Sequence, residues 1–291
     1  EVAELKEKFR FIPDWRLDDI MISYAADQGS VGPHYDFYDV FLLQAEGKRR
    51  WHLGAKADSG SLRVEETNLN ILREFEAESS WLLEPGDMLY LPPQFSHWGI
   101  AEGGCTTISV GFRAPSARTL LEDLAAELAM GLPDHIRYTD PDLTIPANPS
   151  EIDGESVARV QKQLSEWLQQ PQNIAQWFGA IMTEAKYPDT IALDAGTAED
   201  WRDQLAEGAS LILNPGSRCA FCRDPQTLFI DGESFPAPLL FAEAFCNSRT
   251  LSAADLDTHP ELVGENGLID QLVSQGSLIY PEGEEDWDEE E

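Results

Sequence analysis

The strongest constraint on the fold is a change of hydrophobic period near residue 115. Before it, apolar residues lie in short, alternating segments separated by Gly, Pro and Asp, and after it they recur every three or four positions. The short alternating segments before residue 115 predict β-strands. These segments are DDIMISYA, YDVFLLQA, RRWHLGA, SSWLLEP, DMLYLP and TTISVGF. So many short strands favour a β-sandwich or barrel for residues 1–114.

Residues 115–186 carry three apolar stripes with helical spacing. Ser116 is placed to cap the first helix, and Gly131 is placed to end it. Amphipathic helices without a sheet of their own need a partner surface, so we predict a dimerisation region, with packing on the β domain as the alternative. The stripes are Leu120, Leu121, Leu124 and Leu128; Val157, Val160, Leu164, Trp167 and Leu168; and Ile174, Trp177, Phe178, Ile181 and Met182.

Residues 187–291 mix short helical and strand patterns in an order that resembles a winged-helix domain. This region has 23 acidic residues against 4 basic ones, which disfavours a winged-helix regulator that binds DNA. The region ends in the acidic tail EGEEDWDEEE, for which we expect a solvated charge run rather than packed structure.

The whole chain is strongly acidic, with a formal net charge of −33 over 291 residues. This charge argues against nucleic acid and anionic membranes as partners, and leaves either a basic protein partner or a salt-adapted surface. With neither a membrane-length apolar run nor a signal-peptide core, we expect a cytoplasmic protein. The first residue is not Met, so we also expect a fragment that lacks the N-terminal part of its first domain.

Four cysteines in so long a chain do not make a disulfide framework. Cys219 and Cys222 form a CxxC pattern, but no second pair or histidine follows at metal-finger spacing. We interpret them as structural residues.

A histidine and two acids stand in the segment VGPHYDFYD, which otherwise reads as a strand that continues into VFLLQ. Alternation along a strand places His34, Asp36 and Tyr38 on one face. His97 follows 61 residues after Asp36, in a predicted turn. Two histidines and one carboxylate form the facial triad of non-haem Fe(II) oxygenases, and the alternative is a set of satisfied core polar groups. The other histidines lack such settings and are interpreted as structural or surface residues: His52, His135 and His259.

Several segments in order resemble the JmjC-type ribosomal oxygenases, specifically the bacterial branch that hydroxylates an arginine in a large-subunit ribosomal protein. They are FRFIPDWRLDDIMIS, VGPHYDFYDVFLLQAEGKRRW, LEPGDMLYLPP, FSHWG and SVGFRAP. The resemblance covers essentially the whole chain. It implies a mainly β plus α protein with a double-stranded β-helix (cupin/JmjC) core, a helical dimerisation region and a winged-helix C-terminal domain. It maps the iron ligands onto His34, Asp36 and His97.

The resemblance also implies that 2-oxoglutarate and O₂ are cosubstrates. The far carboxylate of 2-oxoglutarate needs a cation, and the family's residue lies 15 positions after the first ligand, at Arg49. Alternation along the strand supports this choice, because Arg49 points away from the face of Lys48 and Arg50. An arginine suits a bidentate carboxylate contact.

For the substrate, the resemblance implies four residues: Asp19, Met21, Tyr38 and Ser109. We expect Asp19 to bind the guanidinium of the substrate arginine, whose aliphatic stem lies between Met21 and Tyr38, so that C3 faces the metal. Without the resemblance, Asp19 is equally well interpreted as a helix-cap or turn acid, and Met21 as a core residue. The rival functions are histidyl hydroxylation, lysyl demethylation, and a non-catalytic cupin-like adaptor that binds a basic protein.

Overall fold

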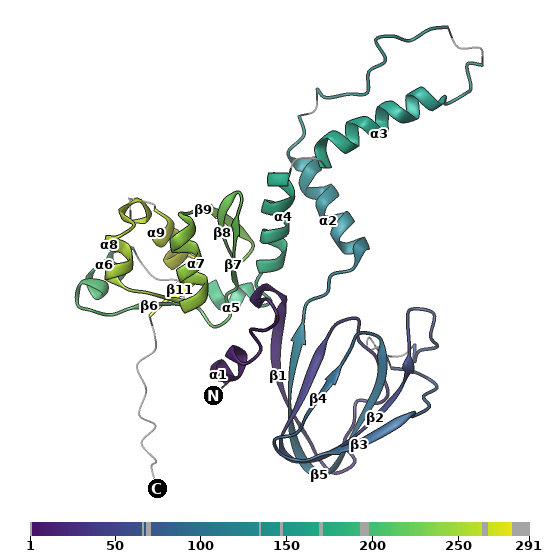
Figure 1. Cartoon of the computed structure of the whole chain (residues 1–291), viewed down its shortest axis with the longest axis vertical. Coiled ribbons are helices and arrows are strands. Elements are labelled where there is room, and N and C mark those ends of the chain that lie inside the picture. The colour runs from purple at the N-terminus through teal and green to yellow at the C-terminus, as the bar shows by residue number, and fades with distance from the viewer. Residues whose placement is uncertain are drawn as a thin grey trace. The chain divides into compact units, whose positions relative to one another are not determined.

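The computed structural model describes residues 2–65, 67, 71–133, 135–145, 148–168, 171–192, 198–263 and 267–280 (Figure 1). The acidic tail and the side chain of Trp167 lie outside the described part. The chain divides into two compact units, the first ending at Ser116 and the second beginning at Ala117. The domain limits at 114 and 186 stay predictions.

The first unit is built on one antiparallel sheet in the order β1-β5-β2-β3, with β4 also paired to β2. Two of the predicted segments join into the single long strand β2, which bulges at three places in its pairing with β5. Bulges bend a strand, so β2 and β5 curve as they run through the sheet (Figure 1). The elements are α1 (Val2–Glu7), a 3₁₀ turn (Asp14–Arg16), β1 (Leu17–Ala25), β2 (Val40–Lys56), β3 (Ser79–Leu83), β4 (Met88–Leu91) and β5 (Phe95–Phe112).

Two local predictions about the histidines were wrong. Residues 31–39 are not a continuous strand, because β2 begins only at Val40 and His34 forms an isolated bridge with His97. Gly32, with φ of +101°, and Pro33 interrupt extended pairing just before it. His97 lies inside β5 rather than in a turn, since FSHWG continues into the same strand as TTISVGF.

The two faces of this sheet have different roles. On the outer face, Phe9 from the turn after α1 packs against Val110 and Phe112, and closes a small core. On the inner face, apolar residues such as Leu42 and Trp51 share a core with polar ones. The buried polar side chains on this inner face are the groups from which a site can be built.

The second unit contains helices and two small sheets, ordered β10-β6-β11 and β7-β8-β9 (Figure 1). Buried residues of α6, α7 and α9, with those of the strands, form its main core. None of its described helices, nor α1, is long and apolar enough to span a membrane. The elements are α2 (Ala117–Met130), α3 (Gly154–Leu168), α4 (Pro171–Thr183), α5 (Pro188–Ala192), α6 (Ala198–Ala206), β6 (Leu211–Leu213), β7 (Cys219–Arg223), β8 (Gln226–Ile230), β9 (Glu233–Pro236), α7 (Leu239–Ser248), β10 (Thr250–Leu251), α8 (Ala253–Asp257), a 3₁₀ turn (Pro260–Leu262), α9 (Leu268–Ser274) and β11 (Leu278–Ile279).

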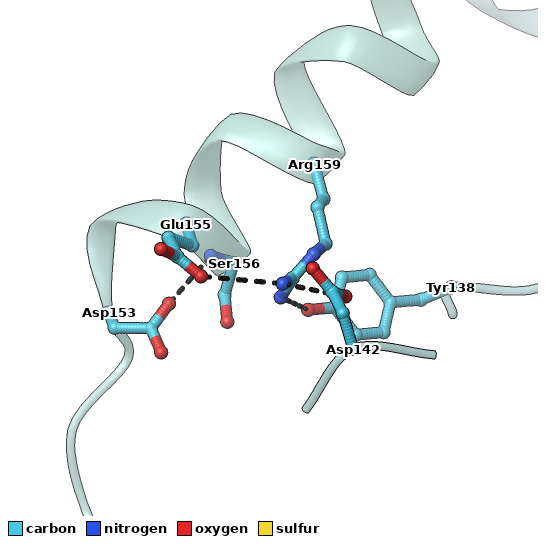
Figure 2. A network of polar contacts seen from close by, with 6 residues as sticks. All are labelled: Tyr138, Asp142, Asp153, Glu155, Ser156 and Arg159. Atoms are coloured by element: carbon cyan, nitrogen blue, oxygen red, sulfur yellow. Dashed lines mark hydrogen bonds and ion pairs between the residues drawn. The ribbon is translucent and has the colours of Figure 1, made fainter. Parts of the chain in front are cut away.

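The start of α3 is fixed by a polar network (Figure 2). Asp153 accepts a hydrogen bond from the backbone N–H of Ser156 at 2.6 Å, as an N-capping carboxylate does. Arg159 donates to Asp142 at 3.0 Å and to Tyr138 at 3.5 Å, and so ties the preceding loop to the first turns of the helix. The predicted helix therefore has a defined beginning, and one flank of it is covered by its own loop.

Candidate metal centre

Three side chains from two separate segments converge on one point of the inner face. The Nε2 atoms of His34 and His97 are 3.1 Å apart, and His97 Nε2 is 3.7 Å from an Asp36 carboxylate oxygen. One ligand atom from each of the three residues lies within 4.8 Å of the others. The spacing of the histidines is set by the backbone, since His34 and His97 exchange two main-chain hydrogen bonds of 3.0 and 2.8 Å.

The two imidazoles are oriented by their Nδ1 atoms. His34 Nδ1 lies 2.9 Å from the Gly32 carbonyl, and His97 Nδ1 lies 3.0 Å from the Phe95 carbonyl. A carbonyl only accepts, so each Nδ1 carries the proton and each Nε2 presents a lone pair. Two lone pairs that face each other at 3.1 Å repel unless a cation lies between them.

This donor set fits a divalent transition metal. Two nitrogen ligands at right angles, each about 2.1 Å from an ion, are about 3 Å apart. Burial, followed by the neighbouring His34 ring, lowers the pKa of His97 to about 4, so the ligand is neutral at neutral pH. Two imidazoles and one carboxylate on one side of an ion leave positions open on the other side. The structure thus brings together the three residues that the sequence analysis selected.

Arg49 lies buried on the same inner face, with only 7% of its surface exposed. Its guanidinium lies 4.9 Å from the Trp51 ring centre, and the Trp51 and His97 ring centres are 6.0 Å apart. Burial lowers the pKa of Arg49, although an arginine stays charged in proteins. Its Nε has no hydrogen-bond partner among the described residues. A buried cation with an unused donor suits an anionic ligand.

The neighbours of Arg49 point the other way, as the alternation of side chains predicts. Lys48 is half exposed and pairs with Glu84, and Arg50 pairs with Glu102 at 2.6 Å. Of the three basic residues in GKRRW, Arg49 is therefore the one whose charge is enclosed beside the metal ligands.

The four residues expected to contact the substrate lie on adjoining positions. Met21 pairs with Ser109 across β1 and β5. A Cβ built on Gly111 would lie 3.4 Å from Asp19 and 4.0 Å from Tyr38, so these two side chains border the same place. Burial raises the pKa of Tyr38, and the carboxylates of Asp36 and Asp19 raise it further. The structure thus places acidic groups and an aromatic ring next to the metal ligands.

Sequence reasoning missed two residues of this site, Gln44 and Thr107. Both are almost completely buried, and Thr107 links Gln44 to Arg49 by hydrogen bonds. The sequence did contain a signal for them, because each is a polar residue at a position of its strand where the alternation of side chains predicts an apolar one facing the core.

Comparison with known proteins agrees with this geometry. Residues 4–120 match the JmjC domain family, and residues 166–278 match the ROXA-like winged helix family. The Escherichia coli (strain K12) ribosomal protein uL16 3-hydroxylase is 34% identical over 281 residues, which cover 96% of this chain and 74% of that protein. The chain belongs to the JmjC ribosomal oxygenase family. The predicted double-stranded β-helix (JmjC) core, the winged-helix domain and the assignment as an enzyme are confirmed, and the dimerisation role of the helical region stays a prediction.

A solved structure and a partial sequence match can also be compared with this ribosomal oxygenase. A structure of the Escherichia coli ribosomal oxygenase YcfD in complex with cobalt and 2-oxoglutarate has a TM-score of 0.80 and 31% identity, and covers 97% of this chain and 74% of that one. A more distant match, 36% identical over 84 residues, is the bifunctional lysine-specific demethylase and histidyl-hydroxylase NO66 of Dictyostelium discoideum; it covers 28% of this chain and 16% of that protein.

Proposed function

We propose that this ribosomal oxygenase uses Fe(II), 2-oxoglutarate and O₂ to hydroxylate C3 of an arginine side chain in a large-subunit ribosomal protein, and that it acts in the cytoplasm. The observation that carries the proposal is the His34–Asp36–His97 set, with its two Nε2 atoms 3.1 Å apart, beside the enclosed charge of Arg49. Bound iron would activate O₂, and 2-oxoglutarate would supply two electrons through its oxidation to succinate and CO₂, so that one oxygen atom of O₂ goes to succinate and the other to the substrate C–H bond.

The chain's own residues have distinct tasks in this reaction. His34, Asp36 and His97 hold the metal, and the hydrogen bonds from the Nδ1 atoms of the two histidines keep both imidazoles in the ligating tautomer. Arg49 binds the far carboxylate of 2-oxoglutarate, since its charge is buried and its Nε is unused. The apolar wall around Trp51 limits water at this end of the site.

An arginine substrate fits the acidic groups at the site. Asp19 and Tyr38 border the same place over Gly111, and Met21 lies in register with Ser109 on the same pair of strands, β1 and β5. A carboxylate binds the guanidinium, and the flat ring and the thioether contact its stem. Positioning C3 next to the metal is then the main contribution of these residues to the rate.

A methyl-lysine or a histidine is the rival substrate, given the partial match to a demethylase and histidyl-hydroxylase. The carboxylate of Asp19 favours a cation over a neutral imidazole. To distinguish these functions, the chain is incubated with Fe(II), 2-oxoglutarate and ribosomal-protein peptides under air. Tandem mass spectrometry should find a gain of about 16 Da, one oxygen atom, on arginine. A gain on histidine, or release of formaldehyde from methyl-lysine, would refute the arginine assignment.

The metal assignment has its own control. His97→Ala should abolish succinate formation that depends on the peptide, because one of the three ligands is lost. Equal turnover by the variant and the wild type would exclude the proposed centre, whereas a wild type that consumes no 2-oxoglutarate would favour the non-catalytic adaptor.

We also propose that the chain forms a homodimer through its helical region. Four apolar residues along α3 are each about half exposed: Val157, Val160, Leu164 and Leu168. An apolar stripe of this length on a helix needs a covering surface. The residue limits 115–186 for this region, and 1–114 and 187–291 for its neighbours, are part of the same proposal.

A further inference from the structure

Three buried polar side chains of the first unit form one hydrogen-bonded series. Gln44 and Arg49 come from β2 and Thr107 from β5, and their exposed fractions are 0%, 7% and 1%. Thr107 Oγ1 donates to Gln44 Oε1 at 3.1 Å, and Arg49 donates to Thr107 Oγ1 at 3.4 Å. At the far end, Gln44 Nε2 donates to the backbone carbonyl of Glu46 at 2.8 Å.

The direction of each bond follows from the one before it. Because the Gln44 amide nitrogen is held by the Glu46 carbonyl, its oxygen faces Thr107. The single hydroxyl proton of Thr107 is then used toward Gln44, which leaves lone pairs to accept from Arg49. The series therefore fixes one end of the guanidinium from the side of β5.

Trp51 and Gly99 also lie against the guanidinium group. The Trp51 ring centre lies 4.9 Å from the Arg49 Cζ, and a Cβ on Gly99 would lie 2.7 Å from Arg49 Nε. A guanidinium that contacts Thr107, Trp51 and the backbone at Gly99 has few orientations left. Bidentate binding of a carboxylate depends on orientation, because two parallel N–H groups must meet two oxygens.

We propose that Gln44 and Thr107 are positioning residues that orient Arg49 for the far carboxylate of 2-oxoglutarate. This inference rests on the proposed function. It assigns no contact between Gln44 or Thr107 and the reacting atoms: they act through Arg49. A purely structural role would instead stabilise the sheet without any preference for a dicarboxylate.

The test is a calorimetric titration of 2-oxoglutarate into the whole chain loaded with Mn(II) under nitrogen, so that no turnover occurs. Thr107→Val keeps the shape and removes the hydroxyl, and should weaken binding about 10-fold, as expected when a charged donor loses its acceptor. Gln44→Met should weaken it in the same direction. Thr107→Ser should restore binding to within about 2-fold of the wild type, because it keeps the acceptor.

The matched control is Thr106→Val on the same strand. The Thr106 hydroxyl bonds to Glu46 at 3.2 Å in an exposed position away from Arg49, so 2-oxoglutarate binding should not change. Mn(II) affinity, measured by electron paramagnetic resonance, should be the same in all variants. If Thr107→Val binds 2-oxoglutarate as well as the wild type, or loses Mn(II) in parallel, the positioning role is wrong. If the wild type binds Mn(II) but no 2-oxoglutarate, the proposed function itself fails.

Discussion

Gly99 occupies a position in β5 where a single methyl group should disturb both the fold and the cosubstrate site. A Cβ on this residue would lie 2.7 Å from Arg49 Nε and 2.7 Å from two ring atoms of Trp51. Carbon atoms in contact are normally about 3.5–4.0 Å apart. Gly99→Ala therefore requires two buried side chains to move by roughly 1 Å, the difference between these distances.

The cost follows from how tightly those side chains are enclosed. Trp51 is 4% exposed and packs in the inner core, while Arg49 is stacked on it and bonded to Thr107. Forcing an extra carbon into such a place typically costs about 1–3 kcal/mol. The displaced guanidinium should also weaken 2-oxoglutarate binding by roughly 10-fold, about 1.4 kcal/mol.

Both effects are measured on the whole chain, stability by urea unfolding and binding by calorimetry with Mn(II) under nitrogen. Gly111→Ala is the matched control, since it makes the same change on the same strand, where the added carbon would lie at 3.4 Å or more from its neighbours. It should retain 2-oxoglutarate affinity. If Gly99→Ala unfolds at the same urea concentration as the wild type and binds 2-oxoglutarate equally well, the enclosed guanidinium is not the cosubstrate site.

Three further changes test other parts of the molecule. Asp19→Asn removes a charge at constant size and should lower kcat/KM for an arginine peptide about 10- to 100-fold, the loss expected for a charged hydrogen bond. Calorimetry should find 2-oxoglutarate binding unchanged. An equal loss of kcat/KM and of 2-oxoglutarate affinity would mean that Asp19 acts on the metal and cosubstrate site rather than on the peptide. Leu164→Glu, in the exposed stripe of α3, should convert a dimer into a monomer in light scattering, whereas Lys162→Gln makes the same charge change outside that stripe and should not. The backbone hydrogen bond from Ser156 lowers the pKa of Asp153, so the carboxylate caps α3 fully at neutral pH and the cap is lost as pH falls through that lowered pKa. Asp153→Asn should make the hydrogen-exchange protection factors of the first turn of α3 independent of pH. A variant with the same pH dependence as the wild type would contradict the cap.

The metal ligands could be selected from sequence even where the local structure was wrong. His34 and Asp36 converge although their segment is not a regular strand, because the single backbone pair at His34 is enough to orient it toward β5. The position of His97 within β5 was missed, because the prolines before it indicate a broken strand and a turn, whereas long-range pairing with β2 keeps the chain extended. The sequence thus identified which residues form the metal site, but not the secondary structure in which they lie.

The enclosure of Arg49 followed from simple alternation in β2, yet its partners did not. Gln44 and Thr107 are 63 residues apart in sequence, and their contact depends on the register between β2 and β5 and on the bulges that shift it. Nothing in the residues near Gln44 indicates that register. The winged-helix fold was recognised from the order of its elements, because short helices and strands alternate clearly after residue 197.

The main-chain pairing of His34 with His97 has a wider consequence. The separation of the two ligating nitrogens depends on peptide groups and carbonyls, which are the same whatever side chains surround them. Positions such as Asp19 and Met21, on a different strand, can therefore vary without altering how the metal is held. A scaffold of this kind allows substrate preference to diverge among relatives while the oxidising chemistry is inherited unchanged.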